Sequence, residues 1–264
     1  MTDQCHRVAK VQARRVDYTN YAKGYDERRF AGQQQSYYEW LRFRALSRAL
    51  RQISRSATVL DVGCGTGRGL ISLQKLGFRS VIGLDFTEDM LHQAVGKART
   101  SELTVARLVR GDAFSLPFVD GQFDVVTSFN FLHMFEFPLQ NDLIREMRRV
   151  ARQVIVVELE SIHKGLVVSR YPEQHRLRNR TKFNSYSEVS RLFSRKDFGS
   201  YRVFGSVLPL LHRWLVRTPS VGALIDSIGA LPLVAWLASR IFVVGVLPAR
   251  QGGRHARVRR QDEG

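Results

Sequence analysis

A glycine-rich turn directly after an apolar segment limits what this chain can fold into more than any other feature of the sequence. Residues 58–62 form the apolar segment, and Gly63, Gly65 and Gly67 follow it at alternate positions. Glycines at such a turn adopt backbone angles that other residues avoid, and they let a ligand approach the main chain. The first N–H groups of a following helix can bind a carboxylate or a phosphate. The pattern therefore predicts a strand, a tight turn and a helix, with a ligand site at the turn.

Apolar segments alternate with amphipathic ones through the central part of the chain, which predicts βαβ units and a parallel sheet covered on both faces. The composition agrees with a folded domain, because 44% of the 264 residues are hydrophobic and 25% are charged. The predicted strands are residues 58–62, 80–85, 103–110, 123–129, 154–159, 198–207 and 240–247. The predicted helices are residues 69–76, a segment starting at Glu88, and residues 141–150 and 186–193, with Gly77 ending the first.

Three parts are expected along the chain. Residues 1–55 are expected to form an N-terminal helical extension, with apolar residues at helical spacing from 37 to 53. Residues 56–248 are expected to form the main α/β domain, with an apolar helical insertion at about 208–239. Residues 249–264 are charged and offer little for a core, which predicts a disordered basic tail.

Three acidic residues stand at or near the predicted carboxyl ends of successive strands, the edge at which such sheets bind ligands. Asp61 lies just before the glycine turn, Asp85 ends the second strand, and Asp112 follows the third. The place of Asp61 suits the amino group of an amino-acid-bearing ligand. The place of Asp85, about 20 residues beyond the turn, suits a ribose diol. The Gly-x-Gly-x-Gly spacing departs from the dinucleotide pattern Gly-x-Gly-x-x-Gly, which disfavours a dinucleotide-dependent oxidoreductase.

Four segments together resemble the class I S-adenosylmethionine-dependent methyltransferases, particularly the ubiquinone-biosynthesis-type branch, which is similar to methyltransferase domain 11. The segments are residues 59–67, 81–90, 111–118 and 123–128, and the resemblance covers roughly residues 20–160. It implies an α/β fold with a Rossmann-like doubly wound sheet of strand order 3-2-1-4-5-7-6. In that order the last strand is antiparallel, and here the apolar insertion would separate strands 6 and 7. The resemblance also implies S-adenosyl-L-methionine as the cofactor and says little about the methyl acceptor.

Matching positions imply where each part of the cofactor would bind. Asp61 and the glycine turn would contact the methionine part, Asp85 the ribose hydroxyls, and Asp112 the adenine edge. Tyr25 lies in a segment similar to the lid of these enzymes, although ordinary helix packing is an alternative for it. The cofactor-binding residues implied are Tyr25, Asp61, Gly63, Cys64, Gly65, Gly67, Asp85, Phe86, Met90, Asp112, Ala113 and Phe129.

Methyl transfer from a sulfonium requires an aligned acceptor in a dry pocket, and a general base helps when the acceptor is a hydroxyl. The candidate catalytic bases are His133, Glu158 and His163, with Glu160 as a further candidate. All of them belong to the ends of the fourth and fifth strands or to the segments that follow. His133 stands in an apolar run, so a packed histidine is the alternative, and a reaction without any base stays open. No metal site is predicted.

The chain is strongly basic, with 41 Lys and Arg against 24 Asp and Glu and a net charge of +17. A positive field attracts the phosphates of lipids, nucleic acids or substrates, and a basic solubility surface is the alternative. The apolar insertion carries Trp214 and Trp236 near several arginines. We therefore expect it either to contact an anionic membrane surface or to complete the core and acceptor pocket.

The expected function is methylation of a small-molecule or amphiphilic, lipid-linked acceptor at oxygen or carbon. The alternatives are an RNA methyltransferase that uses the basic surface and a non-catalytic scaffold that binds the cofactor. Enzymes that methylate exocyclic base amines typically carry Asn/Asp-Pro-Pro-aromatic after the fourth strand, and residues 128–131 read Ser-Phe-Asn-Phe, which makes nucleic acid the weaker expectation. Cys5 and Cys64 indicate no disulfide framework, which favours a cytoplasmic protein, with peripheral attachment to the inner face of a membrane left open.

Overall fold

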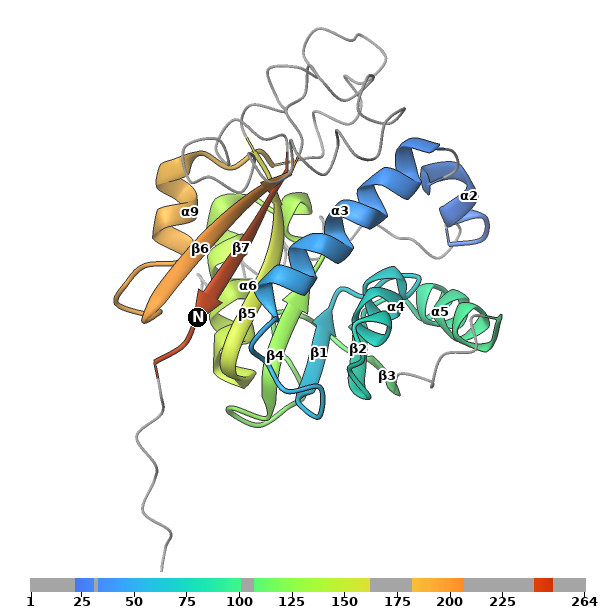
Figure 1. Ribbon diagram of the computed structural model, residues 1–264, viewed down its shortest axis with the longest axis horizontal. Helices are drawn as coiled ribbons and strands as arrows, with labels where there is room; N and C mark the ends of the chain where they lie inside the picture. The colour runs from blue at the N-terminus through green and yellow to red at the C-terminus, as the bar shows by residue number, and fades with distance from the viewer. Residues whose placement is uncertain (1–21, 31–32, 101–106, 162–181, 207–239, 249–264) are drawn as a thin grey trace, which may run out of the picture.

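The computed structural model describes residues 22–30, 33–100, 107–161, 182–206 and 240–248. A seven-stranded sheet runs through them in the order β3-β2-β1-β4-β5-β7-β6, which confirms the predicted order (Figure 1). β7 pairs antiparallel with β5 and β6, and the other pairs are parallel. The strands are β1 (Thr58–Val62), β2 (Ser80–Asp85), β3 (Arg107–Arg110), β4 (Phe123–Ser128), β5 (Ala151–Glu160), β6 (Ser200–Ser206) and β7 (Arg240–Val246).

Helices cover both faces of this sheet, so that the described part of the chain has three layers (Figure 1). One face packs against α3, α4 and α5, and the other packs against α6 and α9. The helices are α2 (Tyr25–Phe30), α3 (Gln33–Ala49), α4 (Arg68–Lys75), α5 (Glu88–Thr100), α6 (Phe137–Val150) and α9 (Tyr186–Leu192), and a 3-10 turn, η2 (Leu132–Met134), follows β4.

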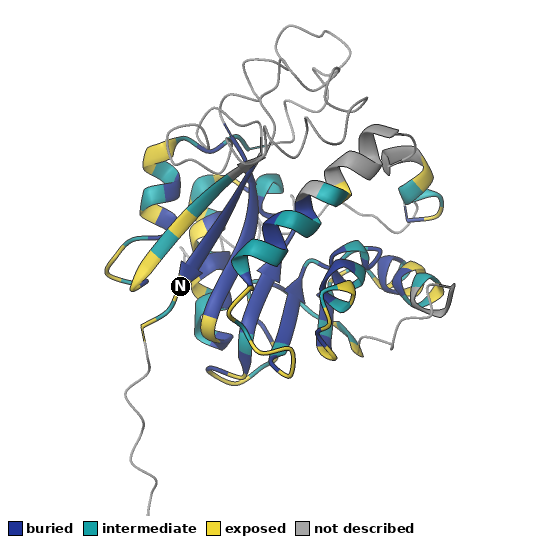
Figure 2. Ribbon diagram, in the orientation of Figure 1, coloured by how far each residue is buried: buried dark blue, intermediate teal, exposed yellow. Residues whose placement is uncertain are grey.

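The alternation of side chains along each strand divides the core into two halves. Val59 packs with Leu46 of α3 and Leu73 of α4, whereas its neighbour Leu60 packs on the opposite face with Leu143 of α6. All four leucines and the valine are fully buried. Burial on both faces explains why the central strands are almost continuously apolar, and Figure 2 shows the same strands buried along their length.

Local signals explain where several helices begin and end. Gly77 has a φ of 94° directly after the C-cap of α4, in agreement with its predicted role at this end. Ser185 begins α9 through a capping box with Glu188. α6 begins at Phe137 rather than at the predicted 141, because Pro138 is tolerated in the first turn of a helix.

Three boundaries differ from the prediction near the ends of the sheet and of the first long helix. β5 runs from Ala151 to Glu160 instead of from 154 to 159, so Glu160 lies in the strand with Glu158, and both residues pair with β7. β3 begins at Arg107, and residues 101–106 lie outside the described part. α3 ends at Ala49, short of the predicted 53, because the chain turns before it enters β1.

Several expectations fall on residues outside the described part of the chain. They concern the insertion at 208–239 with its tryptophans, the tail at 249–264, the segment before residue 22, and His163. Among the helices that the structure describes, none combines the length and the apolar character that a membrane span requires.

Candidate active site

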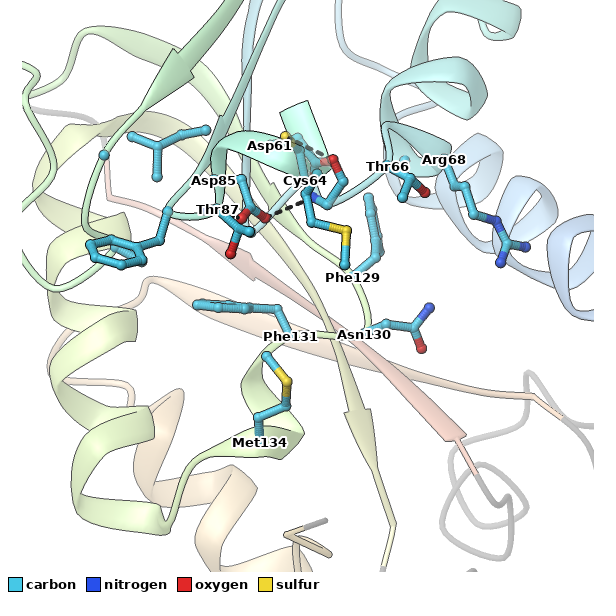
Figure 3. A pocket seen from close by; sticks show the side chains of 18 of the residues that line it. Asp61, Cys64, Thr66, Arg68, Asp85, Thr87, Phe129, Asn130, Phe131 and Met134 are labelled. Carbon is cyan, nitrogen blue, oxygen red and sulfur yellow. Dashed lines mark hydrogen bonds between the residues drawn. The ribbon is translucent and has the colours of Figure 1, made fainter. Parts of the chain in front are cut away.

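A cavity opens at the carboxyl ends of β1, β2 and β4 (Figure 3). The glycine turn, the segments after β2, β3 and β4, and side chains from α2 and α3 surround it. Every predicted cofactor-binding residue except Gly67 lines this cavity. The lining residues are Tyr25, Arg42, Asp61, Gly63, Cys64, Gly65, Thr66, Arg68, Gly69, Leu84, Asp85, Phe86, Thr87, Met90, Gly111, Asp112, Ala113, Phe114, Phe129, Asn130, Phe131, Met134 and Phe135.

The glycine turn is bound tightly to the end of β2. The N–H groups of Gly63 and Cys64 both donate to the carbonyl of Leu84, at 2.8 and 3.0 Å. Gly63 has a φ of 70°, and a Cβ there would lie 2.5 Å from Cγ of Phe131. Gly65 has a φ of 52°, and a Cβ there would meet nothing within 4 Å. The turn therefore needs glycine for its backbone angles, and at Gly65 the main chain is open to an approaching ligand.

Two further glycines shape the start of α4. Gly67 has a φ of 81°, and a Cβ there would lie 3.0 Å from Cβ of Ala94 in α5, so this glycine packs the turn against a helix instead of facing the cavity. A Cβ on Gly69 would lie 2.5 Å from Oδ2 of Asp61. Only a glycine at position 69 leaves room for that carboxylate beside the first turn of the helix.

Asp61 is a buried carboxyl at the edge of the cavity, with 2% of its surface exposed. Its Oδ1 accepts a hydrogen bond from the hydroxyl of Thr127 at 2.8 Å. Burial raises the pKa of Asp61 to about 7, although the Thr127 hydrogen bond and the charge of Arg42 act in the opposite direction. A carboxyl with this pKa gains strongly when a ligand supplies a positive charge next to it.

Asp85 ends β2 and fastens two backbone segments. Its Oδ2 accepts from the N–H of Gly65 at 2.8 Å, and its Oδ1 accepts from the N–H of Thr87 at 2.9 Å. Burial raises its pKa, while these backbone hydrogen bonds lower it. Each carboxylate oxygen can accept a second hydrogen bond, so Asp85 can still bind hydroxyl donors from a ligand in the cavity.

Cys64 fills space between the glycine turn and β2. Its Sγ would lie 2.9 Å from a Cβ on Gly83, and burial raises the pKa of its thiol well above the ordinary value. The thiol therefore stays neutral, which argues against a nucleophilic role.

Two arginines line the cavity on the side of α3 and α4, and no sequence motif had pointed to them. Arg42 is 2% exposed, pairs with Glu158 at 3.6 Å, and lies 5.7 Å from the ring centre of Phe129. Arg68 pairs with Glu39. Burial, reinforced by the charge of Arg42, lowers the pKa of Arg68 to about 10. The signal in the sequence was only a basic residue on an amphipathic helix, which usually marks a solvated face.

The segment after β4 forms an apolar wall opposite Asp85 (Figure 3). Asn130 has a φ of 52°, the only positive φ among the described residues other than glycine, and it turns the chain toward η2. The rings of Phe131 and Phe135 meet edge to face at 5.1 Å, and those of Phe114 and Phe135 at 5.4 Å. Met134 completes this wall, which sequence reasoning had interpreted only as the apolar surroundings of His133.

Of the predicted bases, the three that the structure describes, His133, Glu158 and Glu160, are not among the residues that line the cavity. His133 lies in η2, and its carbonyl accepts the N–H of Lys182 at 2.6 Å. Glu158 is 3% exposed and pairs with Arg42, and Glu160 is 4% exposed at the end of β5. Their catalytic roles, like that of His163, remain predictions.

Comparison with known proteins gives a consistent result. A family model described as a methyltransferase domain matches residues 59–153. A demethylmenaquinone methyltransferase from Staphylococcus aureus (strain MRSA252) is 31% identical over 177 residues, which are 57% of this chain and 71% of the relative. One from Staphylococcus carnosus is 39% identical over 104 residues, which are 38% of this chain and 41% of the relative. The chain thus spans less than half the length of this last relative.

Solved structures show the same fold at low sequence identity. The magnesium protoporphyrin IX methyltransferase from Synechocystis PCC 6803 with bound SAH has a TM-score of 0.65 at 16% identity, covering 90% of this chain and 100% of that one. A SAM-dependent methyltransferase from Thermotoga maritima, a possible histamine N-methyltransferase, has a TM-score of 0.59 at 15% identity, covering 88% of this chain and 98% of that one. With the sheet order, the glycine turn and the Staphylococcus aureus relative, these findings establish that the chain belongs to the class I S-adenosylmethionine-dependent methyltransferases.

Proposed function

We propose that this chain transfers the methyl group of S-adenosyl-L-methionine to a small-molecule acceptor with an apolar ring. The observation that carries the proposal is one cavity in which two carboxyls, the buried Asp61 and the half-buried Asp85, flank the open main chain at Gly65. A ligand that presents an ammonium group and a ribose diol matches these two carboxyls. A pyrophosphate would be repelled by Asp61.

The residues present fit the cofactor part by part. Asp61 would bind the amino group of the methionine part, and the guanidinium groups of Arg42 and Arg68 supply positive charge for its carboxylate. Asp85 would bind the ribose hydroxyls. The adenine end of the cavity offers the apolar side chains of Phe86 and Met90, while Asp112 and Ala113 follow β3. When bound, the cofactor supplies an activated methyl group on a positively charged sulfur, and the protein orients it and excludes water.

The apolar wall of Phe131, Met134 and Phe135 suits an acceptor with a flat, apolar ring. The relatives are named for demethylmenaquinone, and a structural neighbour is named for magnesium protoporphyrin IX. Both compounds contain a flat conjugated ring system, which supports this acceptor class. Among the described residues, this wall carries no carboxylate or histidine. We therefore infer that the acceptor reaches the cavity already ionised or as an acidic carbon, or that a residue outside the described part takes its proton.

The proposal is tested by incubating the protein with methyl-tritiated S-adenosyl-L-methionine and fractionated cell extract. We expect the label in the fraction that dissolves in organic solvent. Label confined to RNA would overturn the small-molecule acceptor and favour an RNA methyltransferase, for which the net charge of +17 is the supporting feature. Cofactor binding without transfer to any fraction would favour a non-catalytic scaffold.

Two methionines that line the cavity from different elements, Met90 of α5 and Met134 of η2, provide a matched pair of variants. Met134→Gln places an amide in the apolar wall, so we expect kcat/KM for the acceptor to fall by about 10-fold or more while the KM for the cofactor changes by less than about 2-fold. Met90→Gln, on the adenine side, should instead raise the KM for the cofactor and leave kcat/KM for the acceptor nearly unchanged. Steady-state kinetics with each substrate varied in turn, together with thermal unfolding of both variants, measures the difference. The same pattern in both variants would contradict the assignment of the two sides.

A further inference from the structure

Three polar side chains from separate parts of the chain meet behind the glycine turn. Thr66 of the turn donates a hydrogen bond to Oδ1 of Asp26 in α2 at 2.9 Å. Lys97 of α5 donates to the hydroxyl of Thr66 at 2.8 Å and forms an ion pair with Oδ2 of Asp26. Each member therefore contacts both others, and we name this group the Asp26 cluster.

The Asp26 cluster reaches the cofactor cavity through Thr66 alone, because Asp26 and Lys97 do not line it. Thr66 is 4% exposed and lines the cavity, whereas Asp26 and Lys97 line a separate hollow between α3, α4 and α5. Tyr25, the neighbour of Asp26 in the sequence, lines the cavity itself. The cluster thus connects α2, which carries Tyr25, to the glycine turn and to α5.

The short length of α2 and the partial burial of its ion pair favour a positioning role for these contacts. α2 has only 6 residues, and a helix of that length is not stable by itself in water. Its place therefore depends on the contacts it makes with the rest of the protein. The side chains of Lys97 and Asp26 are 27% and 24% exposed, so their ion pair is less screened than one on the open surface. Glu39 also lines the hollow, and its carboxylate is paired with Arg68.

We propose that the Asp26 cluster positions α2 so that Tyr25 closes the cofactor cavity, and that affinity for the cofactor depends on this contact. The inference rests on the proposed function, because it concerns the same cavity. By reciprocity, a ligand bound against the glycine turn also strengthens the attachment of α2 to the domain. Asp26 and Lys97 are positioning residues, and they act on the ligand through Tyr25.

The test measures binding of S-adenosylhomocysteine by isothermal titration in a double-mutant cycle. Lys97→Met removes the ammonium group outside the cavity, and we expect it to weaken binding by about 10-fold. In a Tyr25→Ala background the same replacement should change affinity by less than about 2-fold, because the residue through which it acts is already gone. Asp26→Asn should behave like Lys97→Met, and it provides a second variant should one of them fold poorly.

A matched control exists far from the cavity. Asp197 likewise accepts from a hydroxyl, that of Ser194 at 2.9 Å, and pairs with a basic residue of another element, Arg148 at 2.8 Å. Asp197→Asn should leave the affinity for S-adenosylhomocysteine unchanged. Equal losses from Lys97→Met with and without Tyr25, or no loss at all, would overturn the inference. Absence of binding to the wild-type protein would instead overturn the proposed function, so the two failures are distinguishable.

Discussion

Replacing Asp61 with asparagine should weaken binding of S-adenosylhomocysteine by about 100-fold while the protein stays folded. The variant keeps the size of the side chain and the acceptor for the Thr127 hydroxyl, which lies 2.8 Å away. It loses the negative charge that would pair with the amino group of the ligand in a buried position. Isothermal titration measures the loss. The matched control is Asp112→Asn, at the adenine edge, where no charged group of the ligand is expected and the loss should be about 10-fold or less.

The same carboxyl gives binding a specific dependence on pH. Burial raises the pKa of Asp61 to about 7 in the free protein, and a neighbouring ammonium group should lower it again. Binding near pH 7 should therefore release a proton, and affinity should fall as the pH drops below about 7, by up to about 10-fold per unit. Titration in two buffers with different heats of ionisation detects the proton. Two results would contradict the assigned role of Asp61. One is wild-type affinity of Asp61→Asn for S-adenosylhomocysteine, and the other is binding to the wild-type protein without release of a proton.

The raised pKa of Asp61 also determines how the stability of the protein changes with pH. A carboxyl whose pKa is raised from 3.8 to about 7 on folding contributes stability below pH 3.8 and loses that contribution as the pH rises through 7. At pH 8 the wild-type protein therefore carries a buried charge that Asp61→Asn lacks. We expect the variant to gain in Tm relative to the wild type between pH 5 and pH 8, and thermal unfolding of both proteins at the two pH values checks it.

Replacing Arg42 with methionine should lower the free energy of unfolding by about 3–5 kcal/mol. Arg42 and Glu158 are both almost fully buried and lie 3.6 Å apart, so Arg42→Met removes a positive charge from beside the buried carboxylate of Glu158. Denaturation by urea measures the change. The matched control is Arg110→Met, which breaks an exposed ion pair with Glu88 and should cost about 1 kcal/mol or less.

A double variant separates this charge effect from the loss of packing. Glu158→Gln combined with Arg42→Met removes both buried charges, and it should recover a large part of the stability that Arg42→Met alone loses. A loss below about 1 kcal/mol for Arg42→Met would contradict the role assigned to the pair. If Glu158→Gln instead abolished methyl transfer at unchanged stability, Glu158 would act as the base predicted from the sequence.

The cofactor side of the site could be predicted because its signals are local. Gly63 and Gly65 follow a strand directly, and Asp61 and Asp85 stand at strand ends, so position along the chain decides position at the sheet edge. The strand order of the sheet was predicted from the resemblance to class I methyltransferases, which depends on these residues. Gly67 shows the limit of such reasoning, because its φ of 81° serves packing against α5 and not the cavity.

The opposite side of the site could not be predicted because it depends on tertiary packing. Arg42 reaches the cavity only because α3 packs against one face of the sheet with this residue beside the cavity, and the sequence of α3 does not reveal that placement. Phe131 and Met134 face the cavity because the backbone turns at Asn130, with a φ of 52° that asparagine tolerates better than most residues. Helical and apolar patterns identified these segments as buried, but burial alone does not separate a core residue from one that lines a site.

Titration of the wild-type protein with S-adenosylhomocysteine, with NAD as the comparison ligand, tests most directly whether the cavity at the carboxyl ends of β1, β2 and β4 binds the methyl donor. We expect saturable binding of S-adenosylhomocysteine at one site per chain, with a Kd of about 1–100 μM, and no heat from NAD beyond dilution. No measurable binding of S-adenosylhomocysteine, or equal binding of the two ligands, would contradict it.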